Sequence, residues 1–366
     1  MRILIYSYNY YPEPIGIAPL MTELAEGLAK RGHQVRVITA MPNYPERQVY
    51  KDYQGKWYLN EYKNNVQIQR SYIWIRPQPK LLDRILFDAS FVVTNKLLIK
   101  IFAALEKFAY HTASKISVIA DGFVENLISK GVAPEKIEQI PNWVDVNFIR
   151  PSAKKNNPFR AAHNLNGKFV VLYSGNIGLT QGLETVVKAA SELRHVPDIA
   201  FVIVGEAKGL QRLQKYCLNC GADNVLLLPL QPRKQLPEML AAADVGLVVQ
   251  KKNVVSFNMP SKIQLLLASG RALVASVPEN GTAAKAVRQS GGGVIVSPED
   301  SNALSAAILD LYKHPEKVKD LGVHSRHYAM EQYAFEQALN QYEDLFYSVI
   351  ANRQGMESQV VTKQEV

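Results

Sequence analysis

Residues 169–182 read FVVLYSGNIGLTQG, and this stretch decides the class of fold. Residues 169–174 are almost wholly apolar, and glycines follow at positions 175, 178 and 182. An apolar strand that passes through a glycine-bearing loop into a helix, here at 183–193, is typical of a parallel sheet covered by helices. The stretch therefore predicts the first strand of an α/β domain.

The same pattern continues downstream and also occurs at the start of the chain. Further strands are expected at 200–204, 225–228, 245–249 and 272–276, with helices at 207–219, 235–241 and 261–269. The first 40 residues predict a strand at 2–7, a loop at 8–17, a helix with leucines at helical spacing at 18–30 and a strand at 34–39. We therefore expect two α/β units, each with a parallel sheet and right-handed crossovers.

The length of 366 residues fits two domains of ordinary size. We expect an N-terminal Rossmann-like domain at 1–150, a linker at 151–168, a C-terminal Rossmann-like domain at 169–330, a helix at 331–350 that packs back towards the first domain, and a frayed tail at 351–366. The linker is placed by its Pro, Lys and Asn residues, and the last helix by its amphipathic, aromatic pattern.

The charge balance favours anionic partners. The chain has 42 Lys and Arg against 33 Asp and Glu, a net charge of +9, which suits phosphates, nucleic acid or an acidic membrane surface. The excess is spread along the chain without a basic run or a recognised nucleic-acid module, and this argues against a nucleic-acid binder.

The cysteine content and the hydropathy of the chain indicate in which cell compartment the protein is expected. The two cysteines, Cys217 and Cys220, exclude a disulfide scaffold, and they lack further ligands at zinc spacing, so no metal site is expected. No signal peptide is visible, and charged residues interrupt the longest apolar region, 85–105, which makes it a poor transmembrane helix. We expect a cytoplasmic protein, with attachment to the inner face of the plasma membrane as the alternative.

Ligands of open parallel sheets bind at the carboxyl ends of the strands, so the loops there are the candidate site. Neither the dinucleotide fingerprint nor the P-loop occurs, and we expect no cofactor. Gly16, at the end of the first loop, can bring backbone N–H groups close to an anion or a sugar. An ordinary turn glycine is an alternative of equal weight.

The glycine loop at 175–182 suits a turn that cradles phosphate in front of a helix dipole. In the third loop, Pro260 and Ser261 begin a helix that Ser261 is expected to cap. Lys262 in its first turn runs against the dipole preference, which is explained if Lys262 binds a phosphate beside exposed N–H groups. A solvated surface lysine is the alternative. Glu206, at a strand end, is a candidate contact to a nucleobase or ribose.

An ordered set of sequence segments resembles the retaining glycosyltransferases of family 4, which have two facing Rossmann-like domains (the GT-B fold). The segments are Gly16 with 30–35, 140–145, 173–178 with Gln181 and Gly182, 204–206, and 259–262 with 268–271. The resemblance covers residues 1 to about 350. It is nearest to the branch that builds capsule, O-antigen or colanic-acid-type polysaccharides.

The resemblance implies transfer of a sugar from a nucleotide-diphosphate donor on the second domain to a lipid-linked or saccharide acceptor on the first. It implies catalytic roles for Lys262 and Gly16, which would stabilise the departing diphosphate with a cation and N–H groups. The implied donor-binding residues are Gly175, Asn176, Gln181, Gly182, Glu206, Asn258, Ser261, Gln264 and Arg271.

The chain departs from the family pattern in two ways. Asn176 and Gln181 stand where many relatives have Arg and Lys, and Phe257 and Leu265 stand where many have glutamates. The charge of the leaving group then falls on Lys262, helped by Arg271, while Asn258, Gln264 or Glu279 would contact the sugar. The passage through 97–113 also predicts an internal deletion of one or two βα units in the first domain.

Residues 81–109 interleave apolar and basic side chains, as in a helix lying on anionic lipid. A core helix with snorkelling lysines is an equal alternative. The leading functional hypothesis is a retaining glycosyltransferase of surface polysaccharide biosynthesis. The alternatives are a sugar-nucleotide-binding protein that has lost activity and a sugar-nucleotide epimerase.

Overall fold

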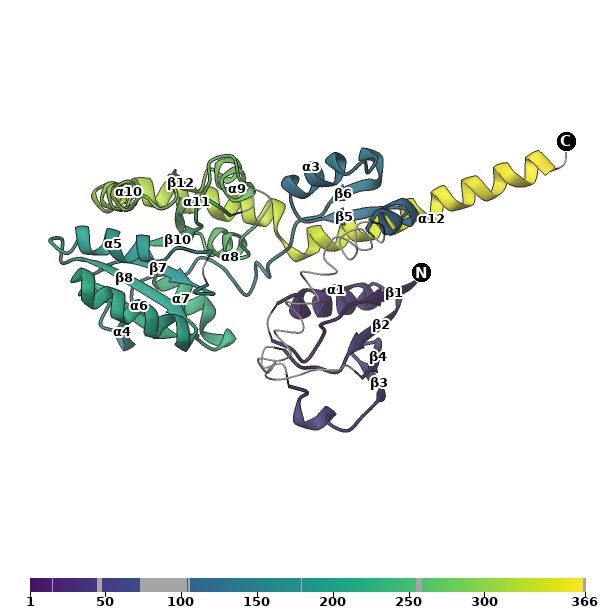
Figure 1. The fold of residues 1–366 in the computed structure, drawn as a ribbon, viewed down its shortest axis with the longest axis horizontal. Helices are drawn as coiled ribbons and strands as arrows, with labels where there is room; N and C mark the ends of the chain where they lie inside the picture. Colours follow the sequence, from purple (N-terminus) through teal and green to yellow (C-terminus); the bar gives the residue numbers. More distant parts are fainter. Residues whose placement is uncertain are drawn as a thin grey trace, which may run out of the picture. The chain divides into compact units, whose positions relative to one another are not determined.

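The computed structural model describes residues 1–14, 16–44, 48–72, 104, 106–178, 180–254 and 259–364, of which 352–364 by the backbone alone. Contacts divide the chain into two compact units, Met1–Ile116 with Leu339–Val366, and Ser117–Ala338 (Figure 1). The two units are therefore described separately.

The first unit begins with the predicted strand, helix and strand, and its described sheet has the order β1-β2-β4-β3. Its elements are β1 (Arg2–Tyr6), α1 (Ala18–Lys30), β2 (Gln34–Ala40), the 3-10 turn η1 (Lys51–Tyr53), β3 (Tyr58–Lys63) and β4 (Val66–Ser71). Strands β1, β2 and β4 are parallel, and β3 is antiparallel to β4. Helix α1 buries Leu24 and Leu28 and packs on the sheet.

The second unit holds a six-stranded parallel sheet in the order β12-β11-β10-β7-β8-β9. Its strands are β7 (Phe169–Ser174), β8 (Ile199–Gly205), β9 (Val225–Pro229), β10 (Val245–Val249), β11 (Ala272–Ser276) and β12 (Gly293–Val296). Its helices are α5 (Glu184–Glu192), α6 (Ala207–Cys220), α7 (Leu236–Ala242), α8 (Lys262–Ala268), α9 (Thr282–Ser290), α10 (Ser301–Lys313) and α11 (Pro315–Gln332). The two faces of the sheet belong to two buried apolar clusters. The expectation of α/β units with parallel sheets is confirmed.

Residues 117–150 group with the second unit, whereas the sequence placed them in a first domain ending at 150. They form the end of β5 (Ile116–Val118), α3 (Asp121–Ser129), η2 (Pro134–Lys136) and β6 (Ile137–Gln139). Asp121 of α3 forms an ion pair with Lys285 of α9, and Val144 bridges to Ala334. These contacts explain the grouping.

The segment 151–168 is not a free linker. It contains α4 (Pro158–Ala162), which packs on α7 and buries Phe159 and Arg160. The sequence predicted a linker here because the segment is rich in Pro, Lys and Asn. That composition does not show that Phe159 and Arg160 are buried in the second unit.

The chain end forms one helix, α12 (Phe335–Gln364), whose residues from Leu339 onward group with the first unit. There Glu343 pairs with Arg31 and His33, which lie at the end of α1. The helix continues through most of the expected tail at 351–366.

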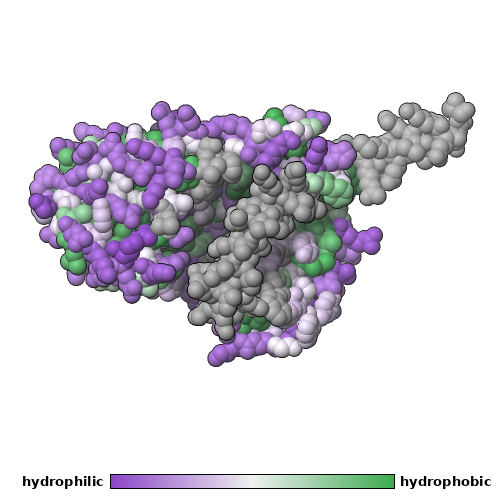
Figure 2. All heavy atoms as spheres, viewed as in Figure 1, coloured by the Kyte–Doolittle hydropathy of each residue, from purple (hydrophilic) through white to green (hydrophobic). Residues whose placement is uncertain are grey.

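The hydropathy of the surface and of the helices can be compared with the membrane contact considered in the sequence analysis. Figure 2 shows mainly hydrophilic residues on the visible face of the second unit. None of the helices in the described part of the chain combines the length and apolar character that crossing a bilayer requires. Most of the segment 81–109, for which a helix on anionic lipid and a core helix are equal alternatives, lies outside the described residues, as does part of 97–113, where we expect a deletion.

Candidate functional site

The strand order of the second unit marks one place in its sheet for a ligand. The chain runs from β7 through β8 to β9 on one side, and then from β10 through β11 to β12 on the other. The connections therefore reverse direction between β7 and β10, and ligands of open α/β sheets bind beyond the carboxyl ends of strands at such a switch point. Gly175 follows β7 and Lys251 lies just after β10, so both belong to this edge.

Lys262, the first residue of α8, lies against the end of β7. Its Nζ is 3.6 Å from the centroid of the Tyr173 ring, a cation–π contact. A Cβ atom placed on Gly175 would lie 3.3 Å from the same Nζ. Gly175 has a φ of +139°, which favours glycine. The ammonium group therefore rests on the first glycine of the loop, as the proposed role in phosphate binding requires.

The charge of Lys262 has no carboxylate partner in the part of the chain that the structure describes. No ion pair of Lys262 occurs among the described residues. Burial lowers the pKa of its amine to about 7, because desolvation disfavours the charged form. At neutral pH such an amine is only partly protonated. A bound anion would favour the protonated form and would pair with its charge.

The start of the glycine loop is fixed by packing. The Tyr173 hydroxyl, whose pKa burial raises, donates a hydrogen bond to the Asn176 carbonyl at 2.6 Å. A Cβ on Gly205 would lie 2.3 Å from Ile177 Cδ1, and one on Gly209 would lie 2.5 Å from Ile177 Cβ. The loop can therefore sit on the end of β8 and the start of α6 only because both positions are glycine.

Lys251 is a second cation at this edge, and the sequence analysis missed it. Its backbone N–H donates to the Thr180 carbonyl at 2.9 Å, and its Cγ would lie 3.0 Å from a Cβ on Gly182. Gly182 has a φ of +62°. The available signal was a lysine two residues after a strand that is apolar on both faces.

Asn176 and Gln181 converge on the middle of the loop. A Cβ on Gly178 would lie 2.9 Å from Gln181 Oε1 and 3.4 Å from Asn176 Nδ2. Gln181 Oε1 is buried and has no hydrogen-bond partner among the residues that the structure describes. These two neutral side chains therefore offer amide groups at the loop.

Three other predicted residues lie on or beside the same rim. Glu206 is the exposed residue before α6, at the carboxyl end of β8. Gln264 on α8 is buried, and its Oε1 has no hydrogen-bond partner. Ser261 is exposed and its side chain does not cap α8, so the expected cap is wrong: its backbone is already helical. Asn258 lies outside the described residues.

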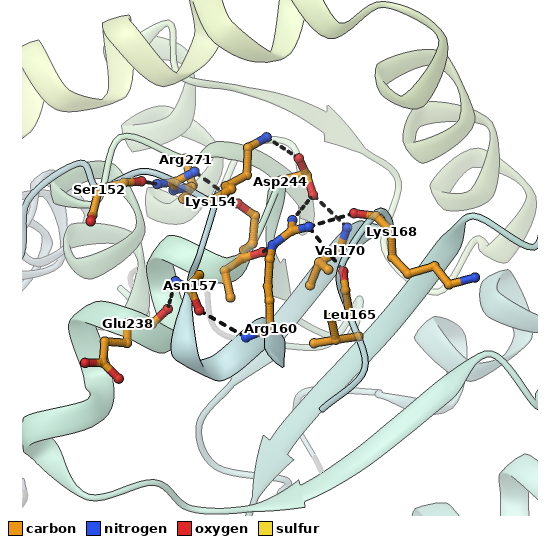
Figure 3. A network of polar contacts seen from close by, with 12 residues as sticks. Ser152, Lys154, Asn157, Arg160, Leu165, Lys168, Val170, Glu238, Asp244 and Arg271 are labelled. Atoms are coloured by element: carbon orange, nitrogen blue, oxygen red, sulfur yellow. Dashed lines mark hydrogen bonds and ion pairs between the residues drawn. The ribbon is translucent and has the colours of Figure 1, made fainter. Parts of the chain in front are cut away.

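Arg271 is not brought to the loop. It precedes β11, at the amino end of the sheet, and its guanidinium donates to the carbonyls of Ala243 at 3.2 Å and Ser152 at 2.7 Å (Figure 3). The glycine loop lies beyond the carboxyl ends of the same parallel strands. The prediction that Arg271 assists Lys262 at the diphosphate is therefore wrong. Lys251 is the second cation that the structure places at the loop.

Gly16 lies in the first unit, where its φ of +75° requires a residue that tolerates the left-handed region. The preceding loop is held by the buried carboxylate of Glu13, which accepts hydrogen bonds from the backbone N–H groups of Asn43 at 2.7 Å and Tyr44 at 2.9 Å. A Cβ on Gly16 would lie 3.7 Å from the Tyr44 ring. Gly16 thus lies close to the stretch that Glu13 fixes at the carboxyl end of β1.

The described residues contain no group of three or more His, Cys, Asp or Glu side chains suited to a metal ion. Cys217 and Cys220, both free thiols, lie in the last turn of α6. Among the described residues, the loop itself brings together two amines, neutral amides and backbone N–H groups, a set suited to a phosphate-bearing ligand, with the Glu206 carboxylate and the Ser261 hydroxyl at its rim.

Comparisons with known proteins give consistent matches. The model of the family "Glycosyl transferases group 1" matches residues 155–328. The chain is 31% identical to the putative colanic acid biosynthesis glycosyl transferase WcaI of Escherichia coli K12, over 84% of this chain and 91% of that protein. A sucrose-phosphate synthase of Thermosynechococcus elongatus aligns with a TM-score of 0.70 at 19% identity, over 96% and 100% of the two chains. HepE of Anabaena, solved with UDP and glucose, aligns with a TM-score of 0.69 at 14% identity, over 94% and 99%.

Proposed function

The chain belongs to the group 1 glycosyl transferases, family-4-like enzymes of the GT-B fold, and on this premise we propose that it moves a sugar from a nucleotide-diphosphate sugar to a lipid-linked glycan acceptor. The pathway is the biosynthesis of a surface polysaccharide. The proposed reaction retains the configuration of the anomeric carbon.

One observation carries the proposal of a diphosphate donor. The Lys262 amine lies against Gly175 at the switch point of the second sheet, with no carboxylate partner among the described residues. When a glycosyl donor reacts, negative charge develops on the departing diphosphate. A cation and backbone N–H groups held in place before the reaction stabilise that charge without reorganisation.

The roles of the neighbouring residues follow from their placement. The N–H groups of the loop from Gly175 to Gly182 would face the diphosphate, and Lys251 would add a second cation. Asn176, Gln181 and Gln264 would offer amides to the donor, Ser261 its exposed hydroxyl and Glu206 a carboxylate to the ribose. Gly16 would bring loop N–H groups of the first unit to the reacting sugar. A reaction with retention needs no pair of carboxylates spaced to activate water, which agrees with this set.

Two relatives support the finer parts of the proposal. HepE of Anabaena was solved with UDP and glucose, which favours a nucleotide-sugar donor. WcaI of E. coli is described as a putative glycosyl transferase of colanic acid biosynthesis, which favours an acceptor that carries a growing polysaccharide. A lipid-linked acceptor of this kind would lie in a membrane, so we propose that the protein works at the inner face of the plasma membrane, with 81–109 as its anionic-lipid contact.

A panel of nucleotide sugars, each incubated with the protein in the presence and absence of a membrane lipid extract, tests the proposal. We expect release of nucleotide diphosphate that depends on the extract. Lys262→Met should reduce this release at least 100-fold, since the cation that faces the leaving group is lost. The matched control Lys215→Met changes an exposed lysine of α6 and should leave the rate unchanged.

Two other outcomes would replace the proposal. Conversion of the donor without any acceptor would indicate a sugar-nucleotide epimerase. Binding of a nucleotide sugar with no turnover would indicate a sugar-nucleotide-binding protein. The sequence feature that favours the second is the apolar pair Phe257 and Leu265 at the positions of the usual glutamates.

A further inference from the structure

A separate cavity of about 540 Å³ lies in the second unit at the opposite edge of its sheet from the glycine loop. Asp244 and Arg271, which line it, directly precede β10 and β11. Gly175 and Lys251, by contrast, follow the carboxyl ends of β7 and β10. The cavity is therefore distinct from the proposed donor site, and a role for it is independent of the proposed function.

The described residues that line this cavity carry an excess of positive charge. Lys154, Arg271, Lys319 and Arg326 face a single lining carboxylate, that of Asp244. Figure 3 shows Lys154 and Asp244 drawn together, with Arg271 beside them. A concave surface lined mainly by one sign of charge concentrates counter-ions of the other sign.

The one carboxylate is already engaged. Asp244 Oδ2 accepts hydrogen bonds from Arg160 Nη2 at 2.6 Å and from the Val170 backbone N–H at 2.8 Å. Its Oδ1 pairs with the Lys154 ammonium. Lys154 and Arg160 therefore pair directly with this carboxylate, and its single negative charge, which also acts on Arg271, does not balance all the lining cations.

Among the described residues, the hydrogen bonds of the two lining arginines all go to backbone carbonyls. Arg271 is 8% exposed, its guanidinium donates to two carbonyls, and its Nε–H has no acceptor in the described part of the chain. Arg326 donates at 2.8 to 3.0 Å to the carbonyls of Val146, Ile149 and Ala268. Burial lowers the pKa of both guanidinium groups. The charge of Asp244 offsets only part of the cost of burying Arg271, and Arg326 is half-buried, so an anion in the cavity would stabilise both guanidinium groups further.

We propose that this cavity binds a phosphate group, either as free phosphate or as a phosphate monoester with an apolar body. Guanidinium groups suit phosphate because their planar donors match its oxygens. The cavity also has apolar walls, among them Pro151, Pro315, Val318 and Val323. Its volume exceeds what a phosphate group alone would fill, which leaves room for the ester.

Calorimetric titration of the full chain with inorganic phosphate and with phenyl phosphate, in a low-salt buffer free of other oxyanions, tests this site. The titrations use Lys262→Met protein, so that the proposed donor site does not contribute. We expect one equivalent of saturable binding. Tighter binding of phenyl phosphate would identify an ester as the ligand, and equal binding would identify free phosphate.

Two variants at exposed positions locate the binding without disturbing the core. Val323 is 59% exposed, so Val323→Glu adds a negative charge to the cavity rim and should weaken binding at least tenfold. Lys319→Ala should weaken it about threefold, and Lys215→Ala, on α6 outside the cavity, should have no effect. Absence of saturable binding, or equal binding by Val323→Glu, would overturn the site. Retained binding in Lys262→Met protein that lacks transferase activity would support it independently.

Discussion

At the scale of single residues, the properties of Lys262 follow from one physical conflict. The amine lies on a glycine and an aromatic ring, where the ring favours its charge and burial opposes it. The balance places its pKa at about 7, within the range of cell pH. Near neutral pH the amine is therefore only partly protonated in the free protein, and a bound anion would raise its pKa and complete its charge.

Donor binding should therefore depend on pH. The diphosphate of a nucleotide sugar does not titrate near neutrality, so the proton must be taken up by the protein. With a pKa of about 7 in the free protein, the dissociation constant should rise about tenfold between pH 6 and pH 8. Titration calorimetry with the nucleotide sugar that binds best measures this directly.

Arginine at the same position separates this cause from others. Lys262→Arg keeps its charge at both pH values, so its dissociation constant should be the same at pH 6 and pH 8. Lys262→Met should bind weakly at both. A wild-type profile without pH dependence would show that the amine of Lys262 does not carry the binding proton.

The sequence predicted Lys262 because a cation in the first turn of a helix is out of place without an anion. The sequence analysis named Arg271 as the second cation and missed Lys251. Both are basic residues close to strand ends, and the difference lies in which end: Arg271 precedes β11 and Lys251 follows β10. The sequence identifies the apolar run of each strand. A basic residue beside that run can contact a ligand at the carboxyl edge of the sheet only if it follows the strand and does not precede it.

At the scale of elements, the glycine loop depends on two glycines outside it. Ile177 fills the space above Gly205 and Gly209, which belong to β8 and α6. The sequence analysis assigned the loop its function from its own glycines and gave Gly205 no packing role. Such contacts join segments about 30 residues apart, and no local pattern reports them.

Gly205→Ala should destabilise the second unit by about 1 to 3 kcal/mol, because the new methyl group would overlap Ile177 Cδ1. The double variant Gly205→Ala with Ile177→Ala removes that atom and should recover part of the loss. Gly209→Ala should gain less from the same second change, since alanine keeps Ile177 Cβ at 2.5 Å, the nearest contact, and removes only Cγ2 at 2.9 Å. Chemical unfolding of the single and double variants checks the pattern, and equal recovery in both cases would refute this account of the packing.

The hairpin of the first unit was also missed from sequence. Strands β3 and β4 are joined by Asn64 and Asn65, with φ values of +48° and +63°. Two consecutive residues in the left-handed region are the mark of the tight turn that matches strand twist, and asparagine tolerates it. The signal was present, but Asn-Asn is a weaker indication than Asn-Gly.

At the scale of the whole molecule, the sequence predicted two α/β units and their order but misplaced their limits. Apolar runs of regular spacing identify strands and helices, because burial decides those residues locally. Limits depend on which unit a segment packs against. The ion pair between Asp121 and Lys285, which assigns α3 to the second unit, joins residues too distant in sequence for any pattern to connect them.

The return of the chain end to the first unit gives the last prediction. Glu343 of α12 pairs with Arg31 and with His33 Nε2, the latter at 2.6 Å. Partial burial opposes ionisation, but the hydrogen bonds from His33 and Arg31 outweigh it and lower the pKa of Glu343. Glu343→Gln should therefore destabilise the first unit by about 1 kcal/mol at pH 7, seen as faster hydrogen exchange in α1. The exposed neighbour Asp344→Asn is the control.

The sign of the pH dependence follows from the direction of that pKa. A carboxylate whose pKa is lowered by folding adds stability above its ordinary pKa, and this stability is lost as the pH falls through the lower folded value. The exchange rates of wild type and Glu343→Gln should therefore differ at pH 7 and converge as the pH falls below the ordinary glutamate pKa of about 4.3 and through the lowered folded value. A difference that persisted in acid would mean that the ionised carboxylate is not what attaches α12 to the first unit.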